Sequence, residues 1–139
     1  MDLQRKPIQS YYENGRLKSC GAWFEGKRYG RWTWWHEKGE RQAVGDFEHG
    51  QAQGLWTFWY EDSVKDCEGV YHGGLKSDLW TYWHANGRLD SQGVFLRNQE
   101  EGPWTSWYSN EQPEESGEYR TGQKSGPWKY WDGNGERLL

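Results

Sequence analysis

The chain has 139 residues and a net charge of −4, which suits one domain and excludes a strongly basic nucleic-acid binder. Leu, Ile, Val and Phe together number only 18, a fraction that is ordinarily typical of disorder. The 12 Trp, 9 Tyr and 4 Phe reverse that expectation, because each buried ring removes a large area from water. Apolar surface built from rings excludes a bundle of Leu-rich helices and a thick α/β core.

Two further patterns bear on location and partners. Apolar runs never exceed three residues, so we expect no membrane-spanning segment. Residues 1–10 lack the apolar stretch of a secretory signal, so we expect a cytoplasmic protein. The charge is uneven, with a net +2 in residues 1–58 and a net −6 in residues 59–139. Such an acidic half is either a solvated surface or a surface that meets a basic partner.

An uninterrupted 24-residue repeat follows a lead of residues 1–10. The repeat domain covers residues 11–139, with units that begin at positions 11, 35, 59, 83 and 107 and a truncated unit from 131. Three columns mark the period. The core tryptophans are Trp32, Trp56, Trp80, Trp104 and Trp128; the tryptophan stripe is Trp35, Trp59, Trp83, Trp107 and Trp131; the glycine column is Gly21, Gly45, Gly69, Gly93 and Gly117. This periodicity is typical of proteins stabilised between neighbouring repeats.

Each unit is expected to fold as a β-hairpin. In the fourth unit, the aromatic and β-branched residues 80–84 predict one strand and residues 89–96 predict its partner. Asn86-Gly87 predicts a two-residue turn in which both residues have positive φ. We expect a looser link over residues 97–102.

The turn glycine is missing from residues 61–64 and 109–112, where we expect looser or bulged turns. Helix is disfavoured by 19 glycines spread along the chain. The prediction is therefore all-β: a single elongated antiparallel β-meander ribbon of about ten strands.

The turn register assigns side chains to two faces. Pairing Tyr82 with Ser91 and Trp80 with Gly93 places the core tryptophans and the glycine column on one face, which we predict to be the core. A glycine opposite each indole lets the ring lie flat over the strand. We place Asp90 and the tryptophan stripe on the other, mostly polar face. The stripe is either buried by coiling of the sheet or semi-exposed for a partner.

The sequence offers no catalytic constellation. His36 and His84 lie two units apart, about 19 Å by ordinary strand spacing, and cannot share a metal ion. The two cysteines are also about two units apart, which is too far for a disulfide and fits a reducing compartment. Adjacent carboxylates such as Glu100 and Glu101 point to opposite faces of a strand, so we expect a solvated surface there. We predict no enzyme, no cofactor and no metal site.

The first unit, residues 11–34, closely resembles the variant MORN repeat; it reads YYENGRLKSCGAWFEGKRYGRWTW. The resemblance covers residues 11–139, although the chain is unusually rich in Trp. Ser63, Asp78 and two other residues stand where the pattern has glycine. Bacterial chains made of such repeats resemble the YwqK-type antitoxins, immunity proteins that neutralise a cognate toxin, often a nuclease or deaminase. Related eukaryotic repeats are implicated in scaffolding and membrane-lipid contact. The resemblance implies protein binding and supplies no catalytic residue.

Charge and resemblance together favour an immunity protein or antitoxin that binds a basic toxin. The candidate partner-binding residues are the tryptophan stripe together with Glu61, Asp62, Asp66, Glu68, Glu114, Glu115 and Glu118. The alternatives are a scaffold or structural repeat protein, or a module that binds glycans, choline or lipid through the stripe. We expect no direct contact with nucleic acid or membrane, and either a monomer or a dimer paired edge to edge.

Overall fold

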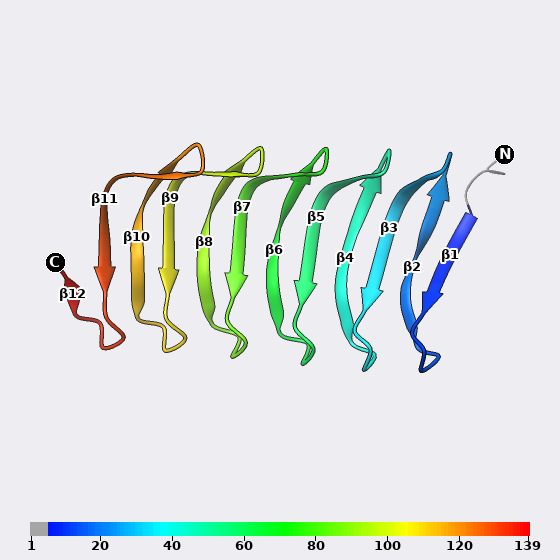
Figure 1. The fold of residues 1–139 in the computed structure, drawn as a ribbon, viewed down its shortest axis with the longest axis horizontal. Coiled ribbons are helices and arrows are strands. Elements are labelled where there is room, and N and C mark those ends of the chain that lie inside the picture. The colour runs from blue at the N-terminus through cyan, green and yellow to red at the C-terminus, as the bar shows by residue number, and fades with distance from the viewer. Residues whose placement is uncertain (1–5) are drawn as a thin grey trace.

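A computed structural model describes residues 6–139; residues 1–5 of the lead lie outside the described residues. Twelve strands in this range form one antiparallel sheet in which the spatial order follows the sequence (Figure 1). Their bounds are β1 (Lys6–Tyr11), β2 (Leu17–Phe24), β3 (Lys27–Trp35), β4 (Arg41–Glu48), β5 (Gln51–Trp59), β6 (Lys65–His72), β7 (Leu75–Trp83), β8 (Leu89–Leu96), β9 (Gln99–Trp107), β10 (Pro113–Arg120), β11 (Gln123–Trp131) and β12 (Arg137–Leu138). The predicted all-β meander is confirmed. The sheet exceeds the expected ten strands because β1 begins within the lead and β12 closes the truncated unit.

The loops along the lower edge of Figure 1 are not the predicted two-residue turns. Between β7 and β8, the Gly87 N–H donates to the His84 carbonyl at 2.9 Å and the His84 N–H donates to the Arg88 carbonyl at 2.7 Å. Three residues therefore form the loop, and only Gly87 among them has positive φ, at 86°. Asn86 instead acts through its side chain, which accepts from the Arg88 N–H and donates to the Ser109 carbonyl of the next hairpin. The predicted conformation of Asn86 was wrong for this reason.

A β-bulge restores the predicted core register. The extra loop residue shifts the pairing so that Trp83 lies opposite Leu89, whereas Tyr82 lies opposite Ser91. Asp90 is the unpaired residue between them. The expected pairing of Trp80 with Gly93 is consequently confirmed, because the longer loop and the bulge cancel each other.

Tight two-residue turns lie at the opposite edge, where we expected loose links. Arg97 and Asn98 have φ of 49° and 71°, and β9 begins immediately after them. The four other turns at this edge also place two residues at positive φ; they are Glu25-Gly26, His49-Gly50, Gly73-Gly74 and Thr121-Gly122. Two successive residues at positive φ are typical of the type I′ turn, whose twist matches that of the flanking strands. The predicted loose link over residues 97–102 is therefore wrong.

Two loops without the usual glycine keep the same geometry, which corrects the expectation of looser turns. Ser63 and Glu111 take the left-handed conformation, with φ of 69° and 73°. The Glu111 N–H donates to the Tyr108 carbonyl at 2.9 Å, as Gly87 does to His84. In both loops the side chain before the left-handed residue accepts a hydrogen bond, Asp62 from the Val64 N–H and Asn110 from the Gln112 N–H, and this bond offsets part of the cost of a left-handed side chain.

The core lies on one face of the sheet, where each core indole covers a glycine. Trp80 is fully buried, and its indole N–H donates to the Val70 carbonyl at 3.1 Å. A Cβ on Gly69 would lie 2.1 Å from the Trp80 ring, so only glycine fits beneath it. The prediction that each indole lies flat over a glycine is confirmed. The covered glycine belongs to the preceding hairpin, whereas the register partner of Trp80 is Gly93.

Edge-to-face ring contacts join successive hairpins into one row. Tyr71 meets Trp80 at a centroid distance of 5.1 Å, and Phe95 meets Trp104 at 5.2 Å, both with nearly perpendicular planes. Such geometry is favourable because the positive edge of one ring meets the negative face of another. We call the side of the sheet that carries this row the aromatic face.

Candidate functional site

The tryptophan stripe lies on the face opposite the aromatic face, and its rings are half-buried. Arg41 from the preceding hairpin places its guanidinium 4.6 Å from the centroid of Trp59, and Lys65 places its ammonium 5.5 Å from that of Trp83. Cation–π contacts of this kind cover part of each ring. The stripe is therefore neither fully buried by coiling nor freely exposed. Its role in partner binding stays a prediction.

A column of tyrosine and histidine side chains ties neighbouring hairpins together at the lower edge. The Tyr60 hydroxyl donates to the Trp83 carbonyl at 2.6 Å, and His84 Nε2 bonds the Trp107 carbonyl at 2.7 Å. His36 makes the equivalent bond at 2.8 Å. Because a carbonyl only accepts, each histidine carries a proton on Nε2. These histidines are structural equivalents of tyrosine.

The acidic candidates do not form one surface. Glu61 and Asp62 lie in an exposed loop of the lower edge. Glu68 bonds the Thr57 hydroxyl on the stripe face. The exposed Glu118 follows Gly117 and therefore points away from the aromatic face. The structure thus does not bring all seven acidic candidates together.

Two hollows bring other candidates together: Asp66 lines one with Glu61 and the stripe residue Trp59, and Glu114 and Glu115 line the other. Asp66 lies at a hollow of about 550 Å³ formed around Trp34, Trp56 and other rings. This hollow is mainly apolar.

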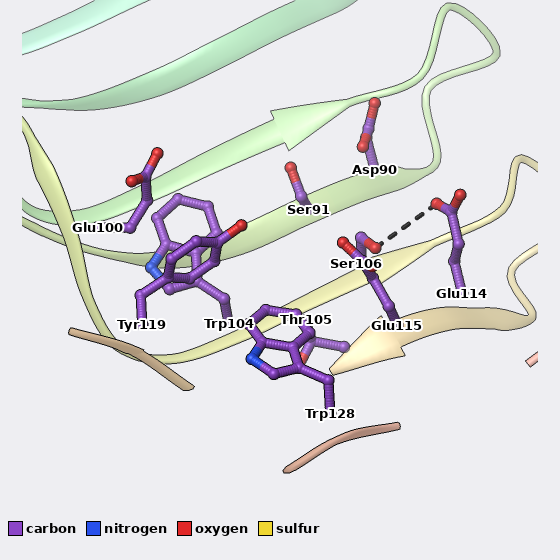
Figure 2. A pocket seen from close by; sticks show the side chains of 10 residues that line it. All are labelled: Asp90, Ser91, Glu100, Trp104, Thr105, Ser106, Glu114, Glu115, Tyr119 and Trp128. Carbon is purple, nitrogen blue, oxygen red and sulfur yellow. Dashed lines mark hydrogen bonds between the residues drawn. The ribbon is translucent and has the colours of Figure 1, made fainter. Parts of the chain in front are cut away.

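The second hollow, which we call the acidic pocket, has a volume of about 300 Å³ and lies between β8, β9, β10 and β11 (Figure 2). Four carboxylates and three rings line it: Asp90, Glu100, Glu114, Glu115, Trp104, Tyr119 and Trp128. No basic side chain is among the described residues that line it. Negative charge and ring faces are therefore combined in one open hollow.

Neighbouring groups partly satisfy these carboxylates. Lys124 Nζ lies 2.9 Å from Glu115, and this hydrogen bond raises the pKa of Lys124. The Ser106 hydroxyl lies 3.5 Å from Glu114, as Figure 2 shows. Within residues 6–139, the Glu100 carboxylate has no hydrogen bond or ion pair. Glu100 is half-buried beside Trp104, and its carboxylate has no basic partner among residues 6–139.

Asp90 was expected on the stripe face, and the structure corrects this placement. It lines the acidic pocket with Ser91, at 3.7 Å from the Nδ1 atom of His84. The reason is the β-bulge, since the strict alternation of faces does not hold at an unpaired residue.

Sequence reasoning missed Asp90, Glu100, Trp104 and Tyr119 as a group. Glu100 was treated as solvated surface, and Trp104 as core alone. A signal was present in the repeat itself. Glu100 stands where other units carry Arg28, Lys76 or Lys124.

The two cysteines are free thiols, as expected. Burial first, and then the neighbouring Asp66 charge, raise the pKa of Cys67 to about 11. The Cys67 thiol is therefore protonated at neutral pH and is a poor nucleophile.

No group of three or more His, Cys, Asp or Glu side chains within residues 6–139 is arranged to hold a metal ion. No helix in that range is long and apolar enough to cross a membrane.

The fold defines a class, an all-β repeat protein of tandem hairpins in one open sheet. Within it, residues 100–121 match the family model of the MORN repeat variant, which supports a chain of MORN-type repeats. A search of curated proteins found no match. Among solved structures, the chain is similar to one in "Crystal structure of accessory secretory protein 1,2 and 3 in Streptococcus pneumoniae". That similarity has 14% identity and a TM-score of 0.41, and covers 76% of this chain and 19% of that chain.

Proposed function

We propose that this protein is a non-catalytic binding protein for a basic protein partner and acts as an immunity protein or antitoxin that neutralises a cognate toxin. The observation that carries the proposal is the acidic pocket, with four carboxylates around ring faces and no basic side chain in its lining. Trp and Tyr are enriched among the residues that dominate the binding energy of protein interfaces.

The charge distribution supports the same partner. Residues 59–139 carry the net −6, and the acidic pocket lies within this half. Opposite charge accelerates the encounter of two proteins and makes the association rate fall with salt. Toxins that act on nucleic acids present basic surfaces, so a nuclease or deaminase toxin suits this half.

We further propose a cytoplasmic location, because two free thiols that lie about two repeat units apart fit a reducing compartment. Fractionation of cells that carry the chromosomal gene tests this placement. Recovery of the protein in an exported fraction contradicts it.

Co-expression tests the binding function. The chain is produced with the protein encoded by the adjacent gene, the complex is isolated, and its Kd is measured at low and high salt. We expect a complex whose association rate falls with salt, and we expect the chain to relieve growth arrest caused by that neighbour. A complex without relief of growth arrest indicates a scaffold. Absence of a complex refutes the binding proposal for that partner.

A further inference from the structure

A column of side chains on the aromatic face covers core tryptophans. The second residue of β3, β7 and β11 is basic, namely Arg28, Lys76 and Lys124. Each lies over the core tryptophan of its own strand, at 5.1 Å, 4.7 Å and 4.3 Å from the ring centroid. In three units, therefore, the side chain that covers the core tryptophan is a cation.

The equivalent residue of β9 is Glu100. It keeps the same backbone place, since Glu100 pairs with Phe95 just as Lys76 pairs with Tyr71. The charge at this place is reversed, so Trp104 receives no cation from its own strand.

The fourth unit differs from the third and fifth units at a second position, which leaves space beside Glu100. Lys76 is held by the Tyr82 hydroxyl at 3.0 Å, and Lys124 lies 3.5 Å from the Tyr130 hydroxyl. Ser106 occupies the equivalent position in β9. The fourth unit therefore lacks both the basic side chain and the ring that holds it, and the acidic pocket is the space that remains.

The second unit lacks the basic side chain but keeps the neighbouring ring, so it shows the effect of the first loss alone. Its covering residue is Ala52, so Trp56 also lacks a cation, but Phe58 retains the ring and packs on Trp56 at a centroid distance of 5.9 Å. The hollow nearby is mainly apolar. Loss of the covering side chain alone therefore gives an apolar surface. At the fourth unit, in contrast, the pocket lies beside Trp104, which is 8% exposed, and is lined by Asp90 and Glu100 of that unit and by Glu114 and Glu115 of the fifth.

We infer that the acidic pocket receives one basic side chain of the partner protein, in first place an arginine, on the face of Trp104. That the side chain comes from a partner protein rests on the proposed function. A guanidinium suits the site because it stacks on an aromatic ring and at the same time donates to carboxylates in a fixed fork. Glu100 supplies a carboxylate that has no basic partner among the described residues, and Asp90 and Glu114 also line the pocket. The guest takes the place that Lys76 holds in the third unit.

A peptide titration tests the pocket without the partner. The probe is acetyl-Gly-Arg-Gly-amide, and its control contains citrulline, which has nearly the same shape and no charge. Binding is followed by NMR on the indole N–H signal of Trp104, assigned with Trp104→Phe. We expect a saturable shift with the arginine peptide alone, while the Trp80 signal stays unchanged because Lys76 covers that ring.

Glu100→Lys is the decisive variant because it installs the covering residue found in the third and fifth units. We expect it to fold and to weaken the arginine peptide by about tenfold or more, within the range of a cation–π contact plus a lost opposite charge. Glu136→Lys makes the same charge change at an exposed loop and is the control. Equal peptide affinity in both variants, or no saturable shift in the unaltered protein, overturns the inference.

The partner from the co-expression experiment separates this inference from the proposed function. If the partner binds and Glu100→Lys weakens it no more than Glu136→Lys does, the pocket assignment fails and the binding function stands. If the arginine peptide binds but the neighbouring protein does not, the pocket stands and the proposed partner fails. Tetramethylammonium chloride is the third probe. If it shifts the Trp104 signal at a lower concentration than the peptide does, the ligand of the acidic pocket is a free organic cation, and the inference of a protein side chain is overturned.

Discussion

The most direct test of the fold is the substitution Gly69→Ala. The added methyl group would lie 2.1 Å from Cδ2 and 2.3 Å from Cε2 of Trp80. Ordinary contact begins near 3.4 Å, so the indole must retreat by about 1.3 Å. It cannot do so freely, because the ring is fully buried and contacts Tyr71 at a centroid distance of 5.1 Å.

The cost has two parts. A displacement of the indole by this distance opens a gap on one side of the ring, and the ring loses a large share of its dispersion contacts there. The indole N–H also leaves the Val70 carbonyl, to which it donates at 3.1 Å. Overpacking and a lost buried hydrogen bond together give an expected loss of about 3 kcal/mol in the free energy of unfolding. Gly117→Ala is expected to cost less, because Trp128 beside it is only half-buried.

Urea-induced unfolding, followed by tryptophan fluorescence and circular dichroism, measures this loss. Gly133→Ala is the matched control, since nothing lies within 4 Å of its added methyl group and its φ is not positive. We expect Gly133→Ala to leave stability unchanged or to raise it by up to about 1 kcal/mol. In a Trp80→Leu background, Gly69→Ala is expected to cost much less, because the flat ring is gone. Equal stabilities of Gly69→Ala and Gly133→Ala would refute the reasoning.

Three further predictions concern the loops and one carboxylate. His84→Phe is expected to lower the free energy of unfolding by about 1 kcal/mol, whereas His84→Tyr restores the bond to the next hairpin and is expected to be nearly neutral, as urea midpoints will show. Ser63→Gly and Glu111→Gly are expected to raise it by about 0.5–1 kcal/mol each, because both residues have positive φ; a loss of stability contradicts this. Burial acts to raise the pKa of Glu68, but hydrogen bonds from a threonine hydroxyl and Lys65 outweigh it and hold the pKa below its ordinary 4.5. Its stabilising effect is therefore present above that pH and lost as pH falls through the lower folded pKa, so unfolding free energies of the unaltered protein and Glu68→Gln are expected to converge on acidification.

The period and the hairpin are properties that sequence alone could predict, because each depends on contacts repeated in every unit. The core register was also predictable, since Trp80 and Gly93 recur at fixed spacing. Turn type was not. Asn-Gly is compatible with both a two-residue and a three-residue loop, and the choice depends on the Asn86 side chain bonding the next hairpin, a tertiary contact.

The candidate site was predicted less well for a related physical reason. Alternation along a strand assigns faces correctly until a bulge interrupts it, and Asp90 lies at one. Glu100 was misread because charged residues in strands are usually solvated. The repeat shows the charge reversal in sequence, but only the contacts of Lys76 and Lys124 show that this position covers a core tryptophan.

A single-layer repeat separates positions that maintain the sheet from positions that can vary. Gly69 and Trp80 must fit each other across two hairpins, so a change at either disturbs the row. The covering residue only rests on the finished aromatic face, and the repeat accepts Arg, Ala, Lys and Glu there without a change in strand pairing. Because such variation leaves the fold intact, it is where partner specificity can reside. The unit that departs from its own repeat at both Glu100 and Ser106 is therefore the part of the ribbon where function is to be sought first.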